Sequence, residues 1–158
     1  MLLMMLFVSI NSQSGELVAQ LHQQRLVAGQ TVEVFMAAFR FSLTAAGIDG
    51  RQPWQIDGQT PIGGFPSLPG SRLGSFYLVW NGRRLNIPPV YYQDVFDPPL
   101  TQRRGWWDHA GVMISVADDG QSLLIELLAS ESACCGYRVI WLVDAEGNVS
   151  RFSDPSIP

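Results

Sequence analysis

The sequence predicts a mostly β domain, a small antiparallel sheet of hairpins with one helix near its N-terminus. Two observations lead to this prediction: short apolar, β-branched runs recur along the chain, and turn-forming residues separate them. The composition agrees with a packed core, because 47% of the residues are hydrophobic and 15% are charged. At 158 residues, the chain is expected to form a single domain, residues 1–158, without needing disulfides or metals.

The first predicted elements lie between residues 15 and 41. Residues 15–27 carry apolar side chains at a rough helical spacing with glutamines between them, so we expect a helix that ends at Gly29. Residues 31–41 begin with apolar and polar side chains in alternation and are rich in aromatics, which favours a strand. Residues 47–74 hold seven glycines and four prolines, which predicts a long loop suited to partner or ligand contact.

A hairpin is the strongest local prediction. Two strand-like runs, residues 75–80 and 83–87, flank Asn81-Gly82. This pair fits a two-residue type I′ turn, since both central residues need a positive φ. Pro88-Pro89 should end the second strand, because proline donates no hydrogen bond to a sheet.

The last third of the chain resembles a meander of short strands. Turn signals stand at residues 118–120 and 145–148. Four strands are expected, at residues 112–116, 122–128, 137–144 and 149–152.

The N-terminal segment, residues 1–14, allows two interpretations. Its apolar run is too short to cross a bilayer, which takes about 20 residues, so no transmembrane segment is predicted. With Ser12 and Ser14 placed like a cleavage site, it is similar to a secretory signal that lacks the basic start, and the protein would then be periplasmic or secreted. Otherwise it is a first core segment of a cytoplasmic protein.

Charge and cysteine content limit the classes of partner. The net charge of −4 offers no basic field for nucleic acid or an anionic membrane. Cys134 and Cys135 are neighbours, so they cannot form an ordinary framework disulfide. They are expected to be two small packed thiols, with a redox or interchain role as the alternative, and homodimerisation stays open.

The sequence carries few groups suited to catalysis. His109 follows Asp108, which in principle supplies the two groups of an acid–base pair, but neighbours on a strand point to opposite faces, which favours a structural histidine. His22, the other histidine, and the two cysteines have none of the spacings of zinc ligands, and phosphate-loop and dinucleotide motifs are missing. We therefore assign no catalytic residue, no metal and no cofactor, and keep a minor hydrolase that uses His109 as the weakest alternative.

An aromatic stretch with neighbouring arginines is a candidate for partner contact. Trp106 and Trp107 follow Arg103-Arg104, and such side chains are common at protein interfaces. Packing into the core is the alternative for these two tryptophans.

Residues 88–152 resemble one blade of a β-propeller. The resemblance is carried by Gly111-Val112-Met113-Ile114-Ser115, Asp119-Gly120-Gln121-Ser122-Leu123-Leu124 and Ser130-Glu131-Ser132-Ala133. It extends to the single-blade periplasmic immunity proteins that neutralise type VI secreted peptidoglycan amidases. The resemblance implies that a loop, here residues 129–136 with Ser130, Glu131 and Ser132, inserts into a toxin's active site. The adjacent cysteines and the missing basic start depart from that family.

These observations predict a non-enzymatic bacterial binding protein that acts through contact with a protein partner, with an immunity or inhibitor role as its most concrete form. A small-ligand-binding or structural module is the alternative, in which residues 47–74 and the stretch around Trp106 line a pocket.

Overall fold

Two antiparallel sheets dominate the computed structural model, which describes residues 15–41, 48–49, 55–56, 60–63, 69–101, 111–129 and 136–157. The first sheet consists of β1 (Leu17–Val27), β2 (Gln30–Arg40), β5 (Ser71–Trp80) and β6 (Arg83–Asn86), in that spatial order. The second has the order β10 (Val149–Ile157), β9 (Gly136–Asp144), β8 (Ser122–Ala129), β7 (Gly111–Val116). The prediction of a mostly β fold with small antiparallel sheets is confirmed.

The remaining described elements are short. β3 (Ile48–Asp49) and β4 (Gln55–Ile56) pair with each other, and the 3-10 turn η2 (Pro89–Tyr91) follows β6. Both β3 and β4 fall within residues 47–74, the predicted loop.

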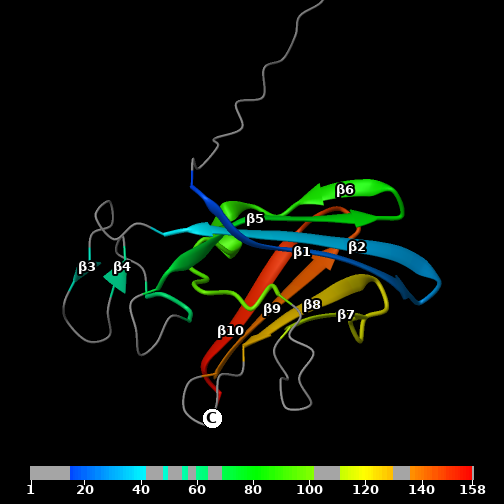
Figure 1. The fold of residues 1–158 in the computed structure, drawn as a ribbon. Helices are drawn as coiled ribbons and strands as arrows, with labels where there is room; N and C mark the ends of the chain where they lie inside the picture. The colour runs from blue at the N-terminus through cyan, green and yellow to red at the C-terminus, as the bar shows by residue number, and fades with distance from the viewer. Residues whose placement is uncertain are drawn as a thin grey trace, which may run out of the picture.

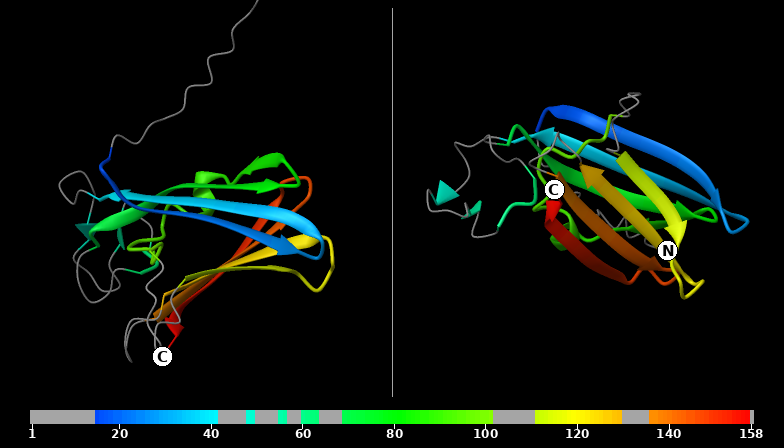
Figure 2. Two further views of the ribbon diagram at one scale, coloured as in Figure 1. Left: turned by 45° about the vertical axis from the view of Figure 1, so that its right-hand side comes forward. Right: turned by 90° about the horizontal axis from the view of Figure 1, so that it is seen from below.

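The two four-stranded sheets lie as two layers whose strands cross obliquely (Figure 1). The layers approach each other at the end that carries the hairpin turns and diverge at the opposite end (Figure 2). Alternate residues of the inner strands, such as Val34 and Met36 on β2 and Ile125 and Leu127 on β8, belong to one buried apolar cluster between the layers.

The predicted helix at residues 15–27 is wrong, because this segment is the edge strand β1. Its inward positions, Leu21 and Gln23, are buried, while His22 between them is exposed, so burial follows a period of two. In the sequence, the core-facing Gln23 interrupts the apolar alternation that would mark a strand. The remaining apolar residues are therefore spaced roughly as in a helix. The side-chain amide of Gln23 is oriented so that both its oxygen and its nitrogen have hydrogen-bond partners. In this orientation its nitrogen donates to the carbonyl of Val112 at 3.0 Å and so joins β1 to β7.

Strand boundaries also differ from the predictions. β5 begins at Ser71, inside the predicted loop, and its register with β2 shifts between Ala37 and Ala38, which leaves Gly74 unpaired. This bulge conceals the alternation that marks a strand. β10 continues to Ile157, five residues beyond the expected end at Phe152.

The predicted hairpin between β5 and β6 is confirmed. Trp80 pairs with Arg83, and the two turn residues have positive φ, 49° at Asn81 and 80° at Gly82. A second turn of this kind joins β1 to β2, with φ of 50° at Ala28 and 78° at Gly29. Ala28 therefore holds a backbone conformation that residues with a Cβ rarely adopt.

Substitutions in the two turns are expected to change the free energy of unfolding in opposite directions. Gly82→Ala should lower the free energy of unfolding by about 1 kcal/mol, because a Cβ is strained at this φ although space surrounds it. Ala28→Gly should raise it by a few tenths to about 1 kcal/mol by relieving the same strain. Urea denaturation measures both values. If both substitutions change the free energy of unfolding in the same direction, the backbone conformation of the turns does not determine the effect.

Residues 88–101 cross the diverging end of the sandwich and tie the sheets together. The fully buried Trp141 of β9 donates its Nε1–H to the carbonyl of Tyr91 at 2.7 Å. Tyr137 of β9 donates its hydroxyl to the carbonyl of Phe96 at 3.1 Å. On the other side, the amide of Leu73 on β5 donates to the carbonyl of Val95 at 2.9 Å. This crossing segment thus bonds to both layers.

Candidate functional site

The residues predicted to contact a partner, Trp106, Trp107, Ser130, Glu131 and Ser132, lie outside the described residues. The same holds for His109, the two cysteines and residues 1–14. Their predicted roles stay predictions. Candidate sites in the described part of the chain come from two features that the sequence did not single out, one on the outer face of the first sheet and one at its hairpin end.

Four side chains form a continuous stack across the outer face of the first sheet. The rings of His22 and Phe35 lie 4.0 Å apart at 18°, and those of Phe35 and Tyr77 lie 4.5 Å apart at 12°. The guanidinium carbon of Arg84 lies 3.7 Å from the centroid of the Tyr77 ring. Each of the strands β1, β2, β5 and β6 contributes one member. We call His22, Phe35, Tyr77 and Arg84 the stacked row.

Strand register produces the stacked row. His22 is paired with Phe35, and Phe35 with Tyr77, so the three rings stand directly opposite one another on neighbouring strands. Val34 and Met36 on either side of Phe35 point into the core, which directs Phe35 outward. Arg84 is paired with Val79 and reaches the Tyr77 ring diagonally.

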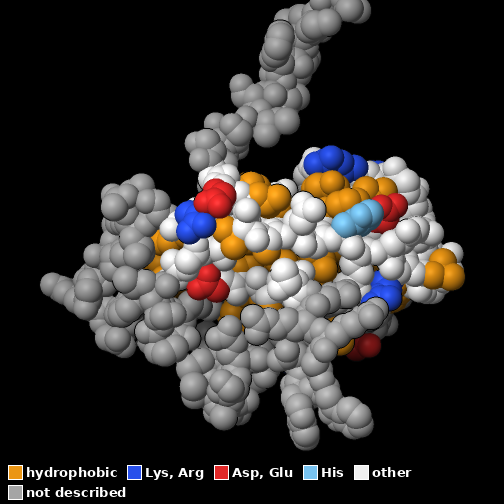
Figure 3. Space-filling model, in the orientation of Figure 1, with side chains coloured by type: hydrophobic (Ala, Val, Ile, Leu, Met, Phe, Trp, Pro, Cys, Tyr) orange, Lys and Arg blue, Asp and Glu red, His pale blue; other side chains and the backbone are white. Residues whose placement is uncertain are grey.

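Polar partners hold both ends of the stacked row. The Nε2 of His22 lies 3.0 Å from a carboxylate oxygen of Glu33, and Arg84 donates its Nε–H to the side-chain oxygen of Asn86 at 2.9 Å. The side chain of His22 is 56% exposed. In Figure 3 the described histidine stands next to an acidic side chain and hydrophobic side chains on the visible surface. The row is thus a fixed aromatic surface open to solvent.

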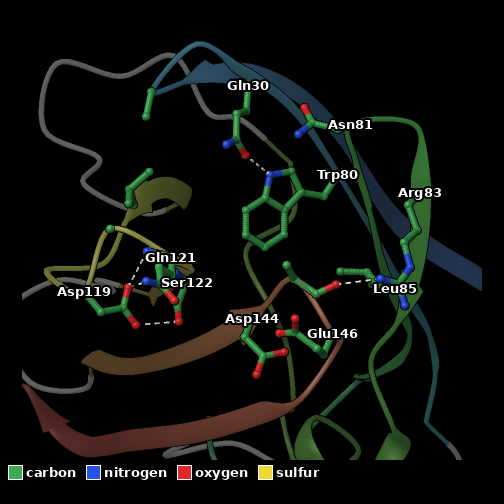
Figure 4. Close-up of a pocket in the computed structure, with 14 residues that line it drawn as sticks. Gln30, Trp80, Asn81, Arg83, Leu85, Asp119, Gln121, Ser122, Asp144 and Glu146 are labelled. Carbon is green, nitrogen blue, oxygen red and sulfur yellow. Dashed lines mark hydrogen bonds between the residues drawn. The ribbon is translucent and has the colours of Figure 1, made fainter.

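The second feature is a cavity of about 760 Å³ at the hairpin end of the sandwich. Turns of all four main hairpins contribute to it (Figure 4). Its lining combines an indole, amides, a hydroxyl, three carboxylates and one guanidinium: Ala28, Gln30, Trp80, Asn81, Arg83, Leu85, Val116, Asp119, Gly120, Gln121, Ser122, Asp144, Ala145 and Glu146. Such a volume suits a small ligand or a few side chains of a larger one.

Hydrogen bonds fix the walls of the cavity. The Nε1–H of Trp80 donates to the side-chain oxygen of Gln30, which orients the indole. Arg83 donates from its Nη1 to the carbonyl of Ala145 at 2.8 Å and so connects the first sheet to the β9–β10 turn. Figure 4 shows Trp80 above Asp144 and Glu146.

Two of the lining carboxylates are held in the charged form by their own turns. The Ser122 hydroxyl and the backbone amides of Gln121 and Ser122 donate to Asp119 and lower its pKa. The side-chain amide of Asn148 does the same for the pKa of Asp144. Both groups are therefore carboxylates at neutral pH.

The described residues include no group of three or more His, Cys, Asp or Glu side chains placed to hold a metal ion. Within the same residues, no helix is long and apolar enough to cross a membrane.

Comparison with known proteins adds no relative. The chain matches no protein family, no curated protein and no solved structure. The resemblance of residues 88–152 to a propeller blade therefore stays a prediction.

Sequence reasoning missed both features for a physical reason. The members of the stacked row are separated by up to several tens of positions in the chain, and only the β1–β2–β5–β6 pairing order brings them together. A helix at residues 15–27, as predicted, does not place His22 beside Phe35. For the cavity, the sequence contains the turn signals at Asn81-Gly82 and residues 118–120. It does not show that these turns meet at one end of the sandwich.

Proposed function

We propose that this protein is a non-enzymatic binding module that acts through contact with a protein partner. The stacked row carries the proposal. Aromatic and arginine side chains are the types that contribute most to binding energy at protein interfaces. Here they are already ordered by contacts within the row, so little side-chain entropy is lost on docking.

The surroundings of the stacked row favour a protein over other partners. Val79 stands on the same face as Tyr77, and Leu26, 76% exposed, lies on the same face of β1 as His22, with Gln24 between them. Glu33 and Arg84 add one charge of each sign. A mixed surface with an aromatic centre suits a polypeptide, whereas nucleic acid requires an excess of basic groups.

The most concrete version of this proposal is a bacterial immunity or inhibitor protein. Its support is the resemblance of residues 88–152 together with a rigid β scaffold, which can present a loop at low entropic cost. In this version Ser130, Glu131 and Ser132 enter the partner's active site. A triple substitution of these three residues by Arg would then abolish inhibition, while the stacked row would contribute affinity outside the inhibited site.

The test of the proposal compares two variants matched in number and in charge change. Tyr77→Ser with Arg84→Gln removes half of the stacked row. Met113→Ser with Ser115→Glu alters two exposed positions on the outer face of the second sheet. Affinity capture from the native host identifies partners of the parent protein, and purified partner is then titrated against both variants.

We expect the stacked-row variant to bind at least about 30-fold more weakly, the loss typical of a hot-spot side chain worth about 2 kcal/mol. The Met113 and Ser115 variant should bind within about threefold of the parent. Circular dichroism and melting temperature establish that both variants fold. Equal weakening of binding in the two folded variants would refute a role for the stacked row. If both variants bind the partner as tightly as the parent protein does, the interface lies on another surface.

A further inference from the structure

We infer that the cavity at the hairpin end binds an organic cation, an ammonium or guanidinium group. The group could belong to a free amine or to a Lys or Arg side chain of a polypeptide. The inference goes beyond the proposed function, since the cavity and the stacked row are different surfaces with separate residues.

The cavity and its indole define the site. Trp80 lies at the end of β5, where its side chain enters the space between the layers, and Leu85 and Val116 line the same space from the two sheets. The hydrogen bond to Gln30 fixes the ring orientation before any ligand arrives. An indole is the aromatic side chain that attracts cations most strongly.

The charged side chains around the cavity favour a positively charged ligand. Asp119, Asp144 and Glu146 line it against a single guanidinium, that of Arg83. Arg83 is engaged with the carbonyl of Ala145, so its charge is already compensated in part by a backbone oxygen. The net negative potential inside a concave, partly apolar space concentrates cations there.

The three carboxylates differ in how strongly hydrogen bonds within the protein hold their side chains. Asp119 and Asp144 accept hydrogen bonds within their own turns, and these bonds position them and keep them ionised. Glu146 is exposed at the β9–β10 turn, and its hydrogen bond to Asp144 comes from its backbone amide, which a side-chain substitution leaves in place. Glu146 is therefore the carboxylate whose removal tests binding without disturbing the fold.

The experiment titrates the full chain with three probes at low and at physiological salt. Agmatine represents a free cation, and the capped tripeptide acetyl-Gly-Arg-Gly-amide represents an arginine side chain. The same tripeptide with citrulline in place of arginine has nearly the same shape without the charge. The indole Nε1–H resonance of Trp80, assigned from its loss in Trp80→Leu, reports binding at the site.

Saturable shifts of the Trp80 resonance with agmatine, the arginine peptide or both, but not with the citrulline peptide, are expected. The probe that binds more tightly identifies the source of the cation. Glu146→Gln should weaken binding about two- to fivefold, as for one exposed charge pair. Trp80→Leu, followed by calorimetry, should weaken it about three- to thirtyfold.

Asp118→Asn is the matched control, because it removes the same charge in the neighbouring turn from a residue that does not line the cavity. It should leave binding nearly unchanged at physiological salt, where exposed charges are screened. The inference is overturned if the citrulline peptide binds as well as the arginine peptide, if Asp118→Asn weakens binding as much as Glu146→Gln, or if neither cation shifts the Trp80 resonance.

Discussion

Replacing Trp141 by alanine is expected to be among the most destabilising single changes in the described core, lowering the free energy of unfolding by about 3–5 kcal/mol. Trp141 is fully buried between the layers and packs edge-on against Phe76, with ring centroids 5.0 Å apart at 71°. Its loss removes a large apolar side chain, an aromatic contact and the hydrogen bond to Tyr91. Folded domains are stable by only about 5–15 kcal/mol, so this variant should approach the limit of folding.

Two further variants separate the contributions. Trp141→Phe keeps a ring but loses the donor, and should cost about 1–3 kcal/mol, because Arg151 still donates to the Tyr91 carbonyl at 3.2 Å. Ile140→Ala, on the opposite face of the same strand, removes a half-buried side chain and should cost less than Trp141→Ala. Urea unfolding of all three gives the comparison. A loss for Trp141→Ala no larger than for Ile140→Ala would show that Trp141 is not central to the core.

The parts of the fold that the sequence predicted are those determined by local chemistry. Asn81-Gly82 needs two positive φ values, and a hairpin follows from that requirement whatever surrounds it. In the second sheet the strands are short apolar runs separated by turn signals at residues 118–120 and 145–148, so β7, β8 and β9 followed from local sequence.

The parts that the sequence did not predict depend on contacts between distant segments. β1 is a strand because it pairs with β2 and because the core accepts the buried Gln23, which has a backbone carbonyl of β7 as its partner. The start of β5 at Ser71 depends on Asp97, which accepts from the amide of Ser71 at 2.7 Å and from its hydroxyl at 3.0 Å. No local pattern at residues 71–74 contains that information.

The crossing segment shows how a stretch without any periodic sequence pattern can still be part of the core. Residues 88–101 lack periodicity, yet Tyr92, Val95, Phe96 and Leu100 are buried. Their backbone bonds go to distant residues, as in the bond from the amide of Ile62 to the carbonyl of Asp94 at 2.8 Å. Burial of an irregular segment requires such partners, since unpaired backbone groups are costly.

The ion pair between Asp94 and Arg151 anchors this segment to β10, and breaking it should cost about 2–4 kcal/mol. The two side chains meet through the two terminal nitrogens of the guanidinium, with Nη2 donating to Oδ2 at 2.8 Å. They are only 13% and 20% exposed, respectively. Arg151→Met retains most of the aliphatic stem but leaves the Asp94 carboxylate without its partner in a poorly solvated place.

A double-mutant cycle tests whether the pair acts as a unit. Asp94→Ala with Arg151→Met should cost less than the sum of the single losses by about 1–3 kcal/mol, because the second change removes the charge that the first left unpaired. Hydrogen exchange at the Ile62 and Phe96 amides should accelerate in each single variant, since both amides bond across the crossing segment. Glu16→Ala is the control, because its pair with Arg40 is exposed and should matter little. Strictly additive losses, with exchange at Ile62 unchanged, would show that the ion pair between Asp94 and Arg151 does not anchor the crossing segment.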